Sequence, residues 1–315
     1  MRIAVFGTGG VGGYYGGRLA EAGEDVVFIA RGPHLEALRE NGLRVESTKG
    51  DFTLPSIQVT GDPEEAGDVD VVMLCVKCWQ VPEAVEGLRP LLGPDTCILP
   101  MENGVETPEQ LAAEFGWRHV LGGVCGIVSF IAEPGLIRHV AYEPFVNFGE
   151  WDNRSSERVD RLRQAFERAK GLIVDTPADI QAAMWRKYIL IASWSGIGGV
   201  TRAPIGVVRS QPGTRRLLET AMEEIHQVAT ALGVRLPDDI VARTLAILDS
   251  VEYGGTASMQ RDIMEGRFSE LEAQTGALVR MGKEAGVATP VNDFIYHALR
   301  PMELRTRGQV SFEAP

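Results

Sequence analysis

Three glycines near the start of the chain have the spacing of a dinucleotide-binding turn. Gly7, Gly9 and Gly12 follow the apolar run Arg2–Phe6 and open a segment able to form a helix, Val11 to Ala22. In such a unit the first glycine permits a tight turn, the second lets the backbone approach a pyrophosphate, and the third allows close packing of helix on strand. The alternative is a glycine-rich turn that only joins a strand to a helix. The residues expected to contact the cofactor here are Gly7, Thr8, Gly9, Gly10, Val11 and Gly12.

The residue after the second expected strand, Asp25 to Ala30, distinguishes the two nicotinamide dinucleotides. NAD-binding enzymes place Asp or Glu there, on the ribose 2′-hydroxyl. This sequence has Arg31. A guanidinium can bind a 2′-phosphate through two hydrogen bonds, whereas a carboxylate would repel it. Arg31 therefore predicts NADP(H), the alternative being an ordinary solvated arginine.

Two further polar residues follow expected strands. Lys77 comes after the apolar run Val69 to Val76, and Asn103 comes shortly after Cys97 to Pro100. Ligands of parallel sheets bind at the carboxyl ends of the strands, so we expect both side chains to face the cofactor. The alternative is that both are solvated loop residues.

These side chains require a parallel sheet to position them. The first half of the chain alternates apolar, strand-like runs with segments of helical periodicity, which is typical of an α/β domain. The expected strands are 2–6, 25–30, 69–76, 97–100, 120–124 and 173–175, with 136–142 and 145–148 as paired strands; the expected helices are 11–22, 81–92, 107–115 and 157–169, the last capped by Ser155 or Ser156.

From about Ala178 the pattern is helical. Helices are expected over 179–195, 215–232, 239–251, 269–285 and 290–302. The fold class is therefore α/β: a Rossmann-type NADP-binding domain over residues 1–177, followed by an all-helical substrate and dimerisation domain over residues 178–315. We expect the ligands to bind in a cleft at the carboxyl edge of the sheet.

Composition excludes several classes of protein. The 315 residues carry a net charge of −12, which argues against nucleic acid as a partner. No apolar stretch is long enough to span a membrane and no secretion signal precedes the first strand, so a cytoplasmic protein is expected. The four cysteines are expected to be buried free thiols, since no second C-x-x-C or histidine cluster completes a metal site; they are Cys75, Cys78, Cys97 and Cys125.

The chain resembles the ketopantoate reductase (2-dehydropantoate 2-reductase) family from end to end. The motifs that carry the resemblance are Gly7-x-Gly9-x-x-Gly12, Arg31, Lys77 in K-x-W-Q, Asn103 in E-N-G, Lys187 in W-R-K, and Ser258-Met259-x-x-Asp262 followed by Glu270. The resemblance implies NADPH-dependent reduction of a 2-keto acid, in that family ketopantoate to pantoate in pantothenate biosynthesis. It implies catalytic roles for Lys187 and Glu270 and substrate binding by Asn103, Lys187, Ser258 and Glu270. It places Lys77, Asn103 and Val128 beside the cofactor.

The residue chemistry is compatible with those roles. Hydride transfer to a ketone carbon leaves an alkoxide, which needs a proton and a nearby positive charge. Lys187, on the expected helix 179–195, can supply both, and Glu270 can orient the lysine or bind a substrate hydroxyl. The alternatives are a solvated helix lysine and a first-turn glutamate stabilised by the helix dipole.

Three positions depart from the family pattern. Ile191, Ser195 and Gly255 stand where pantoate-forming members carry asparagine, and Ile191 lies on the same helix face as Lys187. Our hypothesis is that the reaction type is retained, with ketopantoate as the substrate that the resemblance implies and a different, more apolar 2-keto acid as the alternative. A non-catalytic NADP-binding sensor is a further alternative. A methyltransferase is disfavoured by Arg31, and a serine hydrolase by the absence of a G-x-S-x-G motif. A homodimer is expected, as the commonest state of soluble oligomers.

Overall fold

The computed structural model describes residues 1–313, which form two compact units. The first comprises Met1–Glu102 and Thr107–Ala183, and the second comprises Asn103–Glu106 and the residues from Met184 onward. The division therefore differs from the expected one at residue 177 in two respects. Four residues of the loop after Glu102 belong with the helical unit, and the chain enters that unit within helix α6 (Ile180–Thr201).

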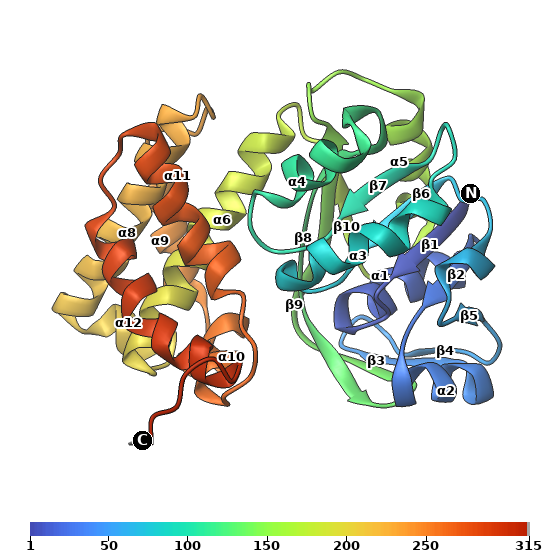
Figure 1. The fold of residues 1–315 in the computed structure, drawn as a ribbon, viewed down its shortest axis with the longest axis horizontal. Coiled ribbons are helices and arrows are strands. Elements are labelled where there is room, and N and C mark those ends of the chain that lie inside the picture. The colour runs from blue at the N-terminus through green and yellow to red at the C-terminus, as the bar shows by residue number, and fades with distance from the viewer. Residues whose placement is uncertain (314–315) are drawn as a thin grey trace. The chain divides into compact units, whose positions relative to one another are not determined.

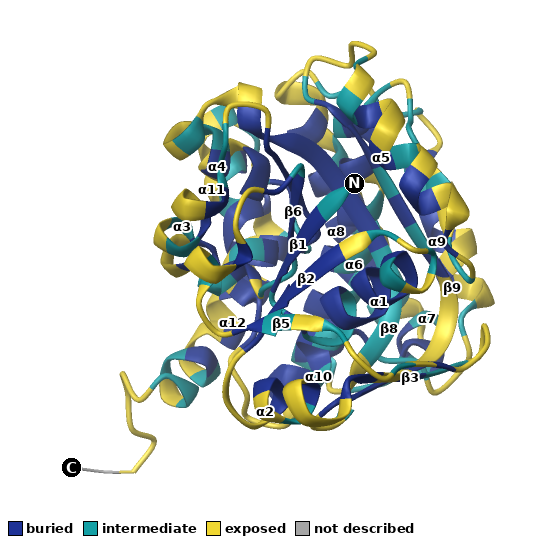
Figure 2. Cartoon of the chain, turned by 90° about the vertical axis from the view of Figure 1, so that its right-hand side faces the viewer, coloured by how far each residue is buried: buried dark blue, intermediate teal, exposed yellow. Residues whose placement is uncertain are grey.

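A five-stranded parallel sheet organises the first unit (Figure 1). Its strand order is β5-β2-β1-β6-β7, and the strands are β1 (Arg2–Phe6), β2 (Asp25–Ile29), β5 (Gln58–Thr60), β6 (Val71–Leu74) and β7 (Cys97–Pro100). Alternate residues of β1 enter two separate cores, Ile3 and Val5 in one and Ala4 and Phe6 in the other. Burial on both faces explains the nearly continuous apolar runs, and β1 and β6 are dark blue in Figure 2.

Helices and single turns connect these strands. They are α1 (Gly10–Glu21), α2 (Gly32–Asn41), α3 (Val81–Leu88), α4 (Thr107–Phe115), α5 (Glu157–Arg168), η1 (Pro63–Ala66), η2 (Cys78–Gln80), η3 (Arg89–Leu91) and η4 (Trp117–His119). Ser156, one of the two expected caps, accepts a hydrogen bond from the Val159 N–H at 3.3 Å. Helix α2 and strand β5 were not expected.

The second sheet of this unit corrects the expectation of two paired strands at 136–142 and 145–148. Strand β9 runs unbroken from Leu136 to Glu150, and its antiparallel partner is β8 (Leu121–Glu133). The other edge of β9 pairs with β3 (Leu43–Ser47) and β10 (Ile173–Asp175), while β4 (Phe52–Leu54) pairs with β3. Within β9, Tyr142 has a φ of +73°, so the backbone is distorted two residues before Pro144. The sequence around this distortion has the pattern of a turn between two strands. Pairing along both edges of β9 keeps the strand continuous.

The second unit is helical, as expected. After α6 it contains α7 (Ile205–Ser210), α8 (Pro212–Ala231), α9 (Ile240–Ser250), α10 (Ser258–Met264), the π-helical turn η5 (Glu272–Gly276), α11 (Ala277–Ala285) and α12 (Pro290–Thr306). Helices α8, α11 and α12 pack side by side (Figure 1). The buried Glu224 carboxylate of α8 accepts the Val291 and Asn292 N–H groups, which caps α12. None of the helices formed by residues 1–313 has the length and hydrophobicity needed to cross a lipid bilayer.

Candidate active site

The glycine turn has a geometry that suits a phosphate group. Gly7 has a φ of +100°, which favours glycine, and a Cβ on Gly12 would lie 2.2 Å from the Gly7 oxygen. A Cβ on Gly9 would have no atom within 4 Å, so the backbone is open at that residue. The first turn of α1 follows at once, and its N–H groups lack helical partners. The turn therefore fits a dinucleotide pyrophosphate.

Thr8 faces away from that open side. Its hydroxyl donates to the Ile29 carbonyl at 3.0 Å, and the Gly7 and Thr8 N–H groups donate to the same oxygen at 3.2 Å each. Both the hydroxyl and the N–H of Thr8 are therefore engaged within the turn. These bonds tie the turn to the end of β2, two residues before Arg31.

Arg31 provides a positive charge at the start of α2. Its side chain is exposed and makes no hydrogen bond or ion pair within residues 1–313. His34, in the first turn of α2, is buried, and its Nδ1 accepts the Gly135 N–H at 3.0 Å. Burial lowers the pKa of His34, while the Thr8 carbonyl opposes that shift. The sequence offered no signal for His34, because an isolated histidine has no motif.

Lys77 and Val128 also belong to the first unit. A Cβ on Gly7 would lie 3.0 Å from the Cys75 carbonyl, two residues before the exposed Lys77. A Cβ on Gly10 would lie 2.5 Å from the oxygen of Ser129, the residue after Val128. Val128 itself lies between two irregularities of the β8–β9 register. The structure thus brings the segments of both residues against the glycine turn.

Of the four cysteines, Cys75 adjoins the glycine turn. Cys78, Cys97 and Cys125 are buried thiols, whereas Cys75 is half-buried rather than fully buried as expected. Burial raises the pKa of Cys97 to about 12, so this thiol stays protonated at neutral pH.

Three expected site residues meet in the second unit. The Nζ of Lys187 donates to Asn103 Oδ1 at 2.8 Å, and Asn103 Nδ2 donates to Glu270 Oε2 at 2.8 Å. Glu270 is 3% exposed, while Asn103 and Lys187 are half-buried. The buried carboxylate thus orients the amide, and the amide oxygen holds the ammonium group. One of the three N–H donors of Lys187 is used in this way, which leaves two for a ligand.

Packing of the surrounding residues explains why these side chains meet. Gly104 has a φ of +97°, and a Cβ there would lie 3.1 Å from the Ala273 oxygen, so glycine lets the 103–106 loop approach the π-helical turn. Arg280 of α11 donates to the Glu106 carboxylate at 3.0 Å. On α6, the Tyr188 hydroxyl donates to the Gln274 carbonyl of η5. Asn103 and Lys187 are therefore each anchored to the segment that follows Glu270.

Ser258 is positioned separately. It is the first residue of α10 and is half-buried. Helix α10 packs on α6, because a Cβ on Gly198 would lie 2.5 Å from the Gln260 side-chain oxygen. Within residues 1–313, the Ser258 side chain forms no hydrogen bond with Lys187, Asn103 or Glu270.

The three departures from the family pattern have distinct surroundings. Ile191 is half-buried, and Ser195 is 0% exposed with a hydroxyl that has no hydrogen-bond partner within the described residues. A Cβ on Gly255 would lie 2.7 Å from Val251 Cγ1 and 3.1 Å from the Glu252 oxygen. The backbone at residue 255 therefore has no room for an amide side chain without rearrangement.

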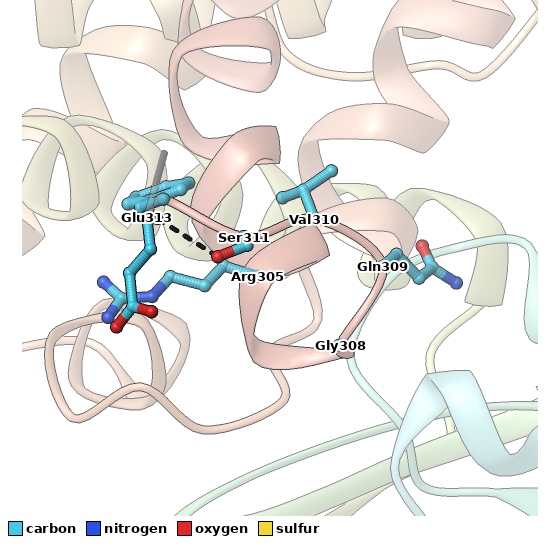
Figure 3. A pocket seen from close by; sticks show the side chains of 7 residues that line it. Arg305, Gly308, Gln309, Val310, Ser311 and Glu313 are labelled. Carbon is cyan, nitrogen blue, oxygen red and sulfur yellow. Dashed lines mark hydrogen bonds between the residues drawn. The ribbon is translucent and has the colours of Figure 1, made fainter. Parts of the chain in front are cut away.

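A surface hollow lies at the C-terminal segment. It is lined by Arg305 and Gly308–Glu313, and the Glu313 N–H donates to the Ser311 hydroxyl at 3.1 Å (Figure 3). None of the expected site residues lines this hollow, so we assign it no part in the chemistry.

Known proteins resemble this chain in sequence and in fold. Models of the ketopantoate reductase PanE/ApbA family match residues 3–153, and its C-terminal model matches residues 179–303. The uncharacterized oxidoreductase YkpB of Bacillus subtilis (strain 168) is 33% identical over 96% of this chain and 99% of its own length. The 2-dehydropantoate 2-reductase of Nostoc sp. (strain PCC 7120) is 30% identical over 99% of both chains.

Solved structures of related proteins have the same fold as this chain. The crystal structure of 2-dehydropantoate 2-reductase from Geobacter metallireducens GS-15 has a TM-score of 0.90 and 32% identity, covering 96% of this chain and 99% of its own. D-mandelate dehydrogenase, at 20% identity and a TM-score of 0.87, shares the fold.

The family models and the named relatives identify the chain as an oxidoreductase that acts on a CH–OH group, and its Rossmann-type sheet and helical unit fit that class. The chain belongs to the ketopantoate reductase family, a family of NAD(P)-dependent oxidoreductases. The family resemblance and the fold class expected from the sequence are thereby confirmed.

Proposed function

We propose that this protein reduces a 2-keto acid to a 2-hydroxy acid with NADPH, and that Lys187 donates the proton. The observation that carries the proposal is the hydrogen-bonded series Lys187–Asn103–Glu270, with 2.8 Å at each step. A held ammonium group supplies both the positive charge and the proton that a developing alkoxide requires.

Each residue of the series has a role. NADPH supplies the hydride when it is bound. Lys187 binds the keto oxygen through an N–H group that Asn103 does not use, and it transfers a proton to that oxygen as negative charge develops. Glu270 fixes the Asn103 amide, so that its oxygen faces the ammonium group. Ser258 and Asn103 complete the binding of the substrate.

The first unit holds the cofactor. The open backbone at Gly9 and the N–H groups at the start of α1 bind the pyrophosphate, as do the neighbouring residues Gly7, Thr8, Gly10, Val11 and Gly12. Arg31 binds the 2′-phosphate, since its guanidinium is exposed and has no partner within residues 1–313. Lys77 and Val128 of this unit contact the nicotinamide half.

The substrate is a 2-keto acid with an apolar side chain. Ile191 lies one helical turn beyond Lys187 and presents only hydrocarbon, and Gly255 leaves no space for an asparagine side chain. The alternative is ketopantoate itself, the substrate in the reaction for which the Nostoc and Geobacter relatives are named.

The second unit also supports self-association. Large apolar side chains are exposed on its helices, among them Leu217, Ile247 and Phe294, the last 63% exposed. A homodimer would cover such side chains. Sedimentation of the purified protein tests this part of the proposal.

A substrate panel tests the reaction. NADPH oxidation would be followed with ketopantoate and with 2-keto acids that carry aliphatic or aryl side chains. We expect turnover, with an apolar keto acid preferred over ketopantoate. A clear preference for ketopantoate overturns the substrate assignment, and NADPH binding without oxidation by any keto acid indicates a sensor.

A lysine variant tests the mechanism. Lys187→Ala should lower kcat by roughly 10²- to 10⁴-fold, the contribution typical of general acid catalysis. Lys283→Ala, which removes an exposed lysine of α11, is the matched control and should retain wild-type kcat. A wild-type rate in Lys187→Ala would exclude the mechanism.

A further inference from the structure

Gln274 is a buried polar residue that the sequence motifs do not include. It lies in the π-helical turn η5 and is 0% exposed. Its Nε2 donates to Glu270 Oε2 at 3.3 Å, and its main-chain N–H donates to the Glu270 carbonyl at 2.9 Å. The orientation of the amide follows from chemistry, because a carboxylate oxygen only accepts and the amide nitrogen must face it.

The same glutamate oxygen receives a second amide. Asn103 Nδ2 donates to Glu270 Oε2 at 2.8 Å, so amides from two separate segments converge on one carboxylate oxygen. The Gln274 backbone is also tied to α6, where its carbonyl accepts the hydroxyl of Tyr188, the residue after Lys187. Gln274 thus contacts Glu270 at one end of the series and, on α6, the residue that follows Lys187.

The oxygen of the Gln274 amide lowers the stability of the folded state. Its Oε1 is buried and has no hydrogen-bond donor within residues 1–313. A buried acceptor without a donor destabilises a protein, and an apolar side chain of similar length would avoid that cost. Retention of an amide here is therefore unfavourable for stability alone. The hydrogen bond from Nε2 to Glu270 instead suggests that the Gln274 amide serves to orient the Glu270 carboxylate.

We infer that Gln274 is a positioning residue for the reaction: its Nε2 holds the Glu270 carboxylate in the orientation that aligns Asn103 and Lys187. The inference rests on the proposed function. A π-helical turn that begins two residues after Glu270 supplies the geometry, since it shifts the register of the side chains within one helix, and such turns recur at functional sites.

The test separates a positioning role from a structural one. Gln274→Met keeps the length of the side chain and removes both amide groups. It should lower kcat roughly 10-fold, as loss of a hydrogen bond to a charged group does, with KM for NADPH unchanged and Tm equal to or above that of the wild type. Gln274→Glu should move the acid limb of the kcat profile to higher pH, since it places a second carboxyl group beside Glu270.

A matched control comes from the same unit. Asn292 is also a buried amide that donates to a buried carboxylate, Glu224 Oε2, at 2.6 Å. Asn292→Leu should lower Tm while kcat of the folded fraction stays within about two-fold of the wild type. If Gln274→Met behaves like Asn292→Leu, or keeps wild-type kcat, the inference is overturned.

A readout without turnover distinguishes the two proposals. Glutamate carboxyl carbons labelled with ¹³C report the titration of Glu270, assigned with Glu270→Gln. Removal of a donor from the carboxylate should move this titration midpoint to higher pH in Gln274→Met. If the wild type reduces no keto acid, the proposed function fails, and this titration still decides the inference: an unchanged midpoint overturns it.

Discussion

Lys187 is linked to the buried Glu270 through the amide of Asn103, with 2.8 Å for each of the two hydrogen bonds. An amide between a cation and an anion has only one favourable orientation, because its oxygen must face the ammonium group and its nitrogen the carboxylate. The link also keeps the ammonium from pairing directly with the carboxylate. The lysine is therefore oriented and still able to donate to a ligand.

Replacement of Asn103 should therefore impair catalysis. Asn103→Ala removes the acceptor of Lys187 and a donor of Glu270, and loss of hydrogen bonds to charged groups should lower kcat roughly 10- to 100-fold. Steady-state kinetics with NADPH and the preferred keto acid measures the effect. Asn41→Ala, at the exposed end of α2, is the control. Equal kcat values for the two variants would show that the link is dispensable.

Arg31 should determine the preference between the two dinucleotides. Loss of a charge-assisted contact with the 2′-phosphate should weaken NADPH binding roughly 10- to 100-fold in Arg31→Ala, and NADH lacks the phosphate that feels this loss. Calorimetric titration gives both Kd values. Arg39→Ala, also on α2 and already paired with Glu36, should change neither. An unchanged ratio of Kd values in Arg31→Ala would refute the assignment.

The Arg158–Glu150 pair should stabilise the first unit. Arg158 Nε and Nη2 donate to the two Glu150 carboxylate oxygens at 2.7 and 2.6 Å. Burial by itself raises the pKa of Glu150, but the bonds from Arg158 outweigh it and hold that pKa below its ordinary value of 4.5. Arg158→Met should reduce the free energy of unfolding at neutral pH by about 2–3 kcal/mol, because it leaves a buried charge unpaired.

The pH dependence of that effect is a further check. A depressed pKa contributes stability above the unfolded value, and this contribution is lost as the pH falls through the folded value. The difference between wild type and Arg158→Met in urea unfolding should therefore shrink below about pH 4.5. Arg163→Met, which removes an exposed partner of Glu167, should show no measurable change at either pH.

His34 should make the first unit sensitive to mild acid. Burial lowers its pKa below the ordinary 6.5, so the folded state prefers the neutral ring, whose Nδ1 accepts the Gly135 N–H. Stability from this group is present above the unfolded pKa and is lost as the pH falls toward the folded one. The Tm of wild type should drop further between about pH 7.5 and about pH 5.5 than that of His34→Gln. Identical drops would contradict this role.

The local sequence pattern was enough to predict much of the secondary structure of this protein. The run Arg2–Phe6 and the three glycines predict a strand, a turn and a helix, because strand burial and tight turns depend on neighbouring residues. The helices of the second unit are likewise predicted by the periodicity of apolar residues. The unbroken β9 strand was not, since its continuity depends on β8, β3 and β10, which pair with it from distant parts of the chain.

The sequence by itself thus determined the two-part fold, the family and the residue types available for chemistry. Only the tertiary structure decided which of them meet: Asn103 leaves the end of β7 to join the helical unit, and Gln274 reaches Glu270 through a π-helical turn. The physical reason is that a hydrogen bond between distant segments depends on how helices pack and where their register shifts. Neither property is encoded in the spacing of residues along the chain.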